Sequence, residues 1–160
     1  MPTISPEQKQ RIRERWLALT LATYPDPARR FLASERDRFR NPVGQTLKEN
    51  IFLLAEELFG AMDAASVRQA LSDLVRLRAV ENFTPREAVA FVFLLKPVLQ
   101  EELASDPGLR LQLENRIDEM ALTAFDLFAQ CRERIHEVQA RELRRREGVR
   151  EKIHAGAEGR

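Results

Sequence analysis

The chain has 160 residues, a length that suits one domain with a full hydrophobic core, and its hydrophobic content of 44% is ordinary for a globular protein. Lys and Arg number 26 against 25 Asp and Glu, so the formal net charge of +1 provides no overall field that would favour nucleic acid or an anionic membrane. The longest apolar run, residues 88–95, is far shorter than the roughly 20 residues of a membrane span. We therefore expect one cytoplasmic domain that binds neither nucleic acid nor membrane.

The first half of the chain carries one helix start after another. Each start combines a capping residue with proline at the first helical position, or has the cap alone: Ser5-Pro6, Asp26-Pro27, Asn41-Pro42 and Asp63. The third of these helices should end near Gly60 and the fourth near Asn82. No segment shows sustained two-residue alternation, so we predict an all-α bundle of about five to seven helices.

A further helix should begin at the capping box Thr84-Pro85-Arg86-Glu87 and is apolar on nearly every side through residues 88–95. Pro97 falls inside this pattern and predicts a kink or a break. A bent central helix could border a cavity for a small apolar ligand, with Phe91, Phe93 and Phe125 as the candidate pocket. The simpler alternative is that these rings fill the core.

The carboxyl-terminal stretch predicts one long helix that begins at Asp106-Pro107 and continues past Arg150. Apolar residues recur along it at intervals of three and four, and we predict that this row is the seam of a homodimer: Ile117, Met120, Ala124, Leu127, Cys131, Ile135 and Val138. At roughly 1.5 Å per residue the helix would outrun its own domain. Beyond Val138 it is polar nearly all round, so that part is either a frayed end or a connector to a partner.

Catalytic and cofactor motifs are not visible in the sequence. The histidines are His136 and His154, too far apart to act as adjacent metal ligands, and no histidine precedes them for a haem. The single cysteine, Cys131, excludes an internal disulfide and is expected to pack rather than react. We therefore predict neither an enzyme nor a cofactor or metal site.

Three stretches together resemble the RsbRD-type N-terminal domain family over about residues 10–145. They are residues 37–44 (Asp-Arg-Phe-Arg-Asn-Pro-Val-Gly), residues 74–85 (Leu-Val-Arg-Leu-Arg-Ala-Val-Glu-Asn-Phe-Thr-Pro), and Ile117-Asp118 with Ala124-Phe125-Asp126 and Cys131-Arg132-Glu133. That family is similar to the sensory modules of RsbR-like co-antagonists of the RsbT kinase in bacterial stress signalling. Related members have a globin-like fold without haem and form dimers.

The resemblance implies a sensory domain at residues 1–145 and a charged helical tail at residues 146–160. It implies a non-enzymatic regulatory module that acts through dimerisation and an unidentified signalling protein. Relatives can continue into a phosphorylatable STAS domain, whereas this chain ends at Arg160, so we expect it to act through another protein. The alternative is a globin-like protein that binds a small apolar ligand without haem.

Overall fold

The computed structural model describes residues 3–159, and these fold into seven α-helices without a strand. The helices are α1 (Pro6–Leu21), α2 (Asp26–Ser34), α3 (Pro42–Phe59), α4 (Ala64–Val80), α5 (Pro85–Ala90), α6 (Leu95–Glu102) and α7 (Pro107–Glu158). The prediction of an all-α protein with a long carboxyl-terminal helix is therefore confirmed.

Local capping explains where most of these helices begin. Ser5 and Thr84 form complete capping boxes with Gln8 and Glu87 at the starts of α1 and α5. Side chains also accept a hydrogen bond from the backbone in the first turns of α3, α4 and α7, donated by Gly44, Ser66 and Leu109 to the capping residues Asn41, Asp63 and Asp106. These side chains satisfy amide groups that would otherwise have no partner in the first turn.

The apolar segment after Thr84 is broken into two short helices. Between α5 and α6 the backbone turns through bonds from Val92 to Val89, from Phe93 to Ala90 and from Lys96 to Phe93, at 3.0–3.1 Å, which are three-residue steps instead of the four-residue steps of an α-helix. Pro97 lies in the first turn of α6, where it lacks a backbone donor. The break predicted from Pro97 is confirmed.

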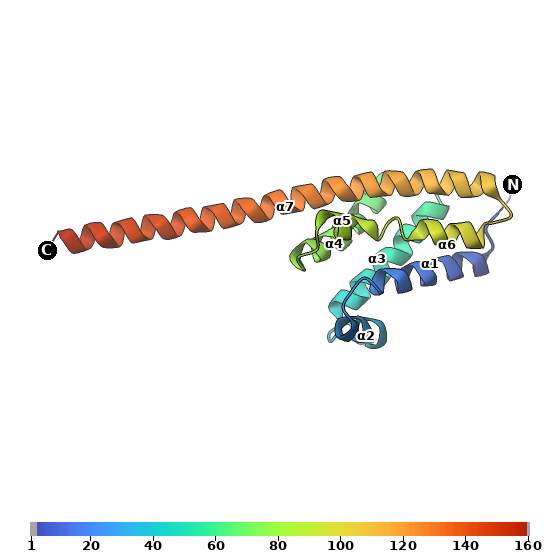
Figure 1. The fold of residues 1–160 in the computed structure, drawn as a ribbon, viewed down its shortest axis with the longest axis horizontal. Helices are drawn as coiled ribbons and strands as arrows, with labels where there is room; N and C mark the ends of the chain where they lie inside the picture. Colours follow the sequence, from blue (N-terminus) through green and yellow to red (C-terminus); the bar gives the residue numbers. More distant parts are fainter. Residues whose placement is uncertain (1–2, 160) are drawn as a thin grey trace.

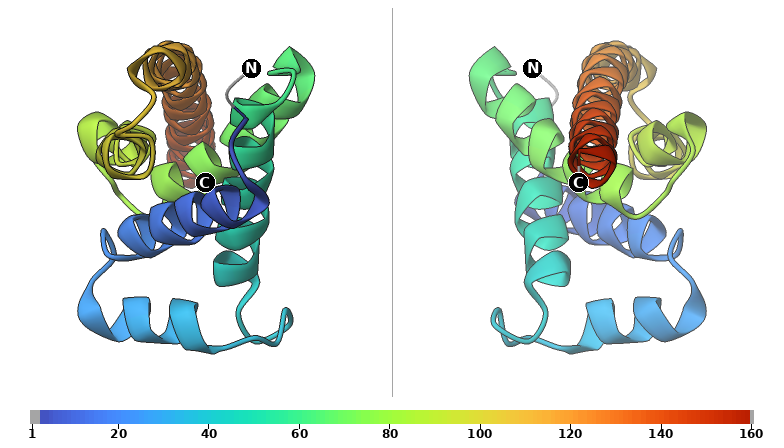
Figure 2. Two further views of the ribbon diagram at one scale, coloured as in Figure 1. Left: turned by 90° about the vertical axis from the view of Figure 1, so that its right-hand side faces the viewer. Right: turned by 90° about the vertical axis from the view of Figure 1, so that its left-hand side faces the viewer.

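The core lies between α1, α3, α4 and α7. Helix α4 is central, because it packs against α3 on one side and against α7 on the other more extensively than any other pair of helices. The side chains that fill this core include Trp16 of α1, Leu54 of α3 and Leu71 of α4, all fully buried. Helix α2 buries no residue and contacts only α1 and α3, at the side of the domain away from α7 (Figure 2).

Helix α7 determines the shape of the molecule. It has 52 residues, and its first half lies along the bundle while its second half extends beyond every other helix (Figure 1). The last buried residue of α7 is Phe128. Residues 136–158, which we call the overhang, extend about 34 Å at roughly 1.5 Å per residue.

Candidate functional site

The structure divides the apolar row of α7 that was predicted as a dimer seam. Four of its members are buried in the core of their own chain: Ile117, Met120, Ala124 and Leu127. Two more pack partly against the same core, namely Cys131 and Ile135. Val138 alone is well exposed, at 64%. The first four residues therefore cannot contact a second copy, because α3–α6 already pack against the face of α7 on which they lie.

A second set of apolar residues on α7 is exposed to solvent. Its members are each more than half exposed, and we call them the outer row: Leu111, Leu122, Phe125, Leu143 and Ile153. They fall in one heptad register, whose other positions include Asp118, Arg132, Gln139 and Arg146. The outer row spans both the domain and the overhang, so it is the apolar face of α7 that a partner can reach.

The residue Phe93 lies beside this outer row. Its ring is 5.4 Å from Nζ of Lys96, and the same Nζ lies 2.6 Å from the carboxylate of Asp118 on α7. Leu122 and Phe125 follow Asp118 on the same face of α7, one and two turns further along. Phe93 is 44% exposed, so it extends the apolar surface of the outer row toward α6.

The three phenylalanines predicted to line an apolar pocket do not enclose one. Phe91 is buried, stacks on Trp16 with ring centroids 6.3 Å apart, and accepts a hydrogen bond on its carbonyl oxygen from Nε1 of Trp16 at 2.8 Å. Phe93 and Phe125 lie at the surface. The break between α5 and α6 turns Phe91 inward and leaves Phe93 outside.

A buried arginine lies where α4 meets α5. Arg78 is almost completely buried, and its Cζ lies 4.3 Å from the ring centroid of Phe83, 5.3 Å from that of Phe91 and 5.5 Å from that of Tyr24. Three aromatic faces therefore surround the guanidinium, an arrangement that stabilises a cation through cation–π attraction. Its Nη2 donates to Oγ1 of Thr23 at 3.1 Å and to the carbonyl oxygen of Glu87 at 3.0 Å.

Burial affects both the hydrogen bonding and the pKa values of this arginine cluster. Within residues 3–159, Nε and Nη1 of Arg78 and the hydroxyl of Tyr24 have no hydrogen-bond partner. Burial lowers the pKa of Arg78, and burial followed by the charge of Glu81 raises the pKa of Tyr24 to about 12. Burial also raises the pKa of Glu81. Because the cluster joins the end of α1 to the α4–α5 corner, we assign it a role in holding the fold.

The sequence does not reveal this cluster, which joins residues far apart in the chain. Asp118 pairs with Lys96, whereas Arg78 contacts aromatic rings. The aromatic partners come from three separate segments. A tyrosine and two phenylalanines near a helix terminus carry no spacing signal that would have linked them to an arginine.

The first stretch that resembled the RsbRD-type family is organised around Asn41. This buried side chain accepts a hydrogen bond from the amide of Gly44 at 2.9 Å and donates to the carbonyl oxygens of Leu32 and Glu35 at 3.0 Å each. Asp37 accepts a hydrogen bond from the amide of Phe39 at 2.9 Å. Asp37 and Asn41 therefore hold the turn before α3.

The described residues offer no metal cluster. Among residues 3–159, no three histidine, cysteine or carboxylate side chains lie close enough together to hold one ion. In the same part of the chain, no helix combines the length and the apolar character needed to cross a bilayer.

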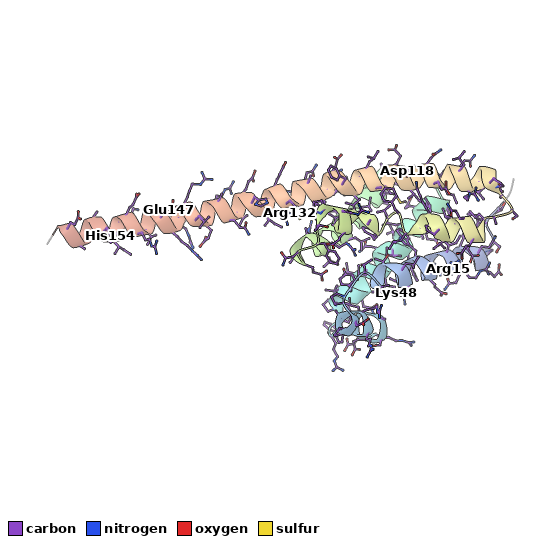
Figure 3. The ribbon with its side chains drawn as sticks, viewed as in Figure 1. Arg15, Lys48, Asp118, Arg132, Glu147 and His154 are labelled. Atoms are coloured by element: carbon purple, nitrogen blue, oxygen red, sulfur yellow. The ribbon has the colours of Figure 1, made fainter. Side chains whose placement is uncertain are left out.

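The overhang is a helix without neighbours from its own chain. Glu147 and His154 lie on it with no other helix beside them, whereas Arg132 marks the region where α7 leaves the bundle (Figure 3). Glu142 accepts ion pairs from Arg145 at 2.9 Å and from Arg146 at 3.4 Å, and such pairs one turn apart support an exposed helix. The segment is helical through Glu158, as expected of a connector rather than of a frayed end.

Comparison with known proteins identifies the family of this chain. The profile of the RsbT co-antagonist protein rsbRD N-terminal domain matches residues 10–143. An uncharacterized protein of Archaeoglobus fulgidus is 29% identical over 80 residues, which are 49% of this chain and 53% of the relative, so this chain spans about half the length of that curated relative. No solved structure is significantly similar, and the globin-like fold stays a prediction. Since the family profile covers most of the chain, the protein belongs to the RsbT co-antagonist protein rsbRD N-terminal domain family.

Proposed function

We propose that this chain is a non-enzymatic regulatory sensor module, cytoplasmic in location, that acts in stress signalling through a homodimer and a signalling protein partner. The observation that carries the proposal is the overhang of α7, a regular helix that continues past the last buried residue of the domain, Phe128. A helix that buries nothing gains little stability from its own chain, since most helical stability in proteins comes from packing of an apolar face. The overhang is therefore explained best by a contact outside this chain.

The outer row is the face through which we propose that two copies pair. Apolar residues at heptad positions bring two helices together along a narrow seam. The outer row occupies part of one heptad register and is exposed, whereas the inner row is buried in its own chain as far as Leu127. Leu122 and Phe125 would form the centre of the contact beside Phe93 of the same copy. A two-fold arrangement places the same patch on both sides, so one set of residues suffices.

The overhang also suits a partner of a different kind. Arginines and glutamates are interspersed along it, and Leu143, Val149 and Ile153 are exposed between them. In the proposed mechanism a change in the domain shifts α7, and the signalling partner reads that shift at the overhang. The alternative function, binding of an apolar ligand, has less support because Phe93 and Phe125 lie at the surface.

Light scattering coupled to size-exclusion chromatography tests the dimer. The wild type should elute with twice the mass of one chain, and the double substitution Leu122→Glu with Phe125→Glu should yield a folded monomer, because four buried carboxylates would face one another across the seam. The control is Val80→Glu, which places one such charge on an apolar residue of α4 whose exposure, 69%, is similar to the 63% of Leu122. Val80→Glu should remain a dimer.

Two results would contradict the proposal. A wild type that remains monomeric at concentrations of about 100 μM would exclude a dimer of functional affinity. A double variant that still dimerises would show that the outer row is not the seam. Circular dichroism of both variants confirms that any change in mass does not come from unfolding.

A further inference from the structure

A groove between α4 and α7 is lined by several arginines. It encloses about 350 Å³, and it is lined from α4 by Ala65, Arg68, Gln69, Ser72, Val75 and Arg76 and from α7 by Leu127, Gln130, Cys131 and Arg134. Arginines thus reach it from both walls. This volume is at the lower end of the range of small-molecule sites, which suits a compact ligand rather than a protein segment.

No carboxylate lines this groove, although the chain has nearly as many acidic as basic residues. Within residues 3–159, Arg68, Arg76 and Arg134 form no ion pair, whereas Arg11 and Arg15 on α1 share the carboxylate of Glu102. Three arginines therefore line this groove without an ion-pair partner.

Polar side chains line the groove from both helices. Nη2 of Arg68 lies 3.4 Å from Oε1 of Gln130, so the two walls already meet at one point. Gln69 bonds Asp73 at 3.2 Å, and Asp73 lines the neighbouring groove between α3 and α4, which Arg76 also borders. The carboxylate of Asp73 therefore belongs to the lining of the neighbouring groove and not to that of the groove between α4 and α7.

We infer that this groove binds a small multivalent oxyanion, a phosphate ester or a polycarboxylate, between Arg68 and Arg76 of α4 and Arg134 of α7. Guanidinium groups bind phosphate and carboxylate oxygens through paired N–H donors, and a ligand with two or more negative charges would neutralise the three arginines. Bound there, the anion would tie α4 to α7 close to the base of the overhang. The binding site is inferred from the groove alone, and only its effect on signalling rests on the proposed function.

The single cysteine makes this inference testable without a labelled ligand. Cys131 lines the groove and is partly buried, so an anion bound between the arginines would cover its thiol. The uncharged reagent iodoacetamide should alkylate Cys131 of the wild type, and pyrophosphate or citrate should slow the reaction saturably at constant ionic strength maintained with KCl. At about ten times the dissociation constant the rate should fall by about tenfold, since only the free fraction reacts.

Substitutions separate specific binding from a general effect of charge. Arg68→Gln with Arg134→Gln removes one charge from each wall and should raise the concentration for half-protection by at least about tenfold. The matched control, Arg144→Gln with Arg150→Gln, removes the same charge from the overhang and should protect like the wild type. Protection by pyrophosphate but not citrate would identify phosphate as the ligand chemistry, and the reverse result would identify carboxylate.

Three outcomes would overturn the inference. The first is an alkylation rate that responds to neither anion beyond the effect of KCl. The second is equal protection in the wild type and in the groove variant. The third is loss of protection in the variant with Leu122→Glu and Phe125→Glu, because protection would then depend on dimerisation. Retained protection in that variant, even if the wild type is a monomer, would support the anion site independently of the proposed dimer.

Discussion

Substituting Gly44 by alanine would force the carboxamide of Asn41 away from the helix that it caps. A Cβ atom added at Gly44 would lie 2.7 Å from both Cγ and Oδ1 of Asn41, closer than non-bonded atoms approach. Asn41 is buried and holds the end of α2 as well as the start of α3, because its side chain bonds the carbonyl oxygens of Leu32 and Glu35. The added methyl group should therefore disturb two helix ends at once.

The expected cost follows from the bonds that would be strained. Loss of the cap to the amide of Gly44 costs about 1 kcal/mol, and weakening of the two bonds to carbonyl oxygens costs about 1 kcal/mol each. The greater helix propensity of alanine offsets up to about 1 kcal/mol of this destabilisation. The net destabilisation should be about 2 kcal/mol, which for a chain of this size lowers Tm by roughly 4–8 °C.

Urea denaturation followed by the fluorescence of Trp16 measures this change, because Trp16 is the only tryptophan and is fully buried. Gly148→Ala is the matched control, since nothing lies within 4 Å of a Cβ added there, and it should be neutral or slightly stabilising. In an Asn41→Ala background Gly44→Ala should also be neutral or stabilising, which gives a coupling energy of about 2–3 kcal/mol. Equal destabilisation in both backgrounds would refute the contact with Asn41 as the cause.

Three further predictions concern the arginine cluster and the overhang. Arg78→Met should cost at most about 1 kcal/mol because it keeps apolar volume, whereas Arg78→Ala should cost about 2–5 kcal/mol through the cavity it leaves, and equal losses in urea denaturation would show that the charge itself is required. Tyr24 should titrate with a pKa of about 12 when its absorbance is followed at 295 nm. Because the folded state holds this proton more tightly than the unfolded state, the free energy of unfolding should be full below pH 10 and decline between pH 10 and 12. A titration midpoint near 10 in the folded protein would contradict this. In the monomeric variant with Leu122→Glu and Phe125→Glu, removal of residues 143–160 should leave Tm within about 2 °C, since α7 buries no residue after Phe128, and a larger fall would reveal contacts of the overhang with its own domain.

The elements whose signals are local could be predicted from the sequence. Ser5, Asp63, Thr84 and Asp106 act within a few residues of their own position, so the helix starts follow from the chain itself. The break before Pro97 is of the same kind, because a missing donor affects only its own helix. The number of helices and the length of α7 could be predicted for this reason.

The choice between the two faces of α7 could not be made in this way. The row that contains Ile117 recurs at intervals of three and four, as a dimer seam would, and only the position of α4 and its neighbours shows that this row is covered within its own chain. Arg78 presents the same difficulty, since Thr23 lies 55 residues away in sequence. Burial and long-range pairing depend on how the helices pack, which residue spacing alone does not specify.

The continuity of α7 through the bundle gives it the mechanics of a lever. Because its buried part and its overhang are one helix, a tilt of about 5° at the end of the bundle would displace the far end by about 3 Å over an arm of about 34 Å. Small adjustments in the packing of α4 against α7 are thus amplified with distance from the domain. A binding partner placed near Ile153 would experience a larger displacement than one placed near Val138, so the length of the helix determines how far a partner moves.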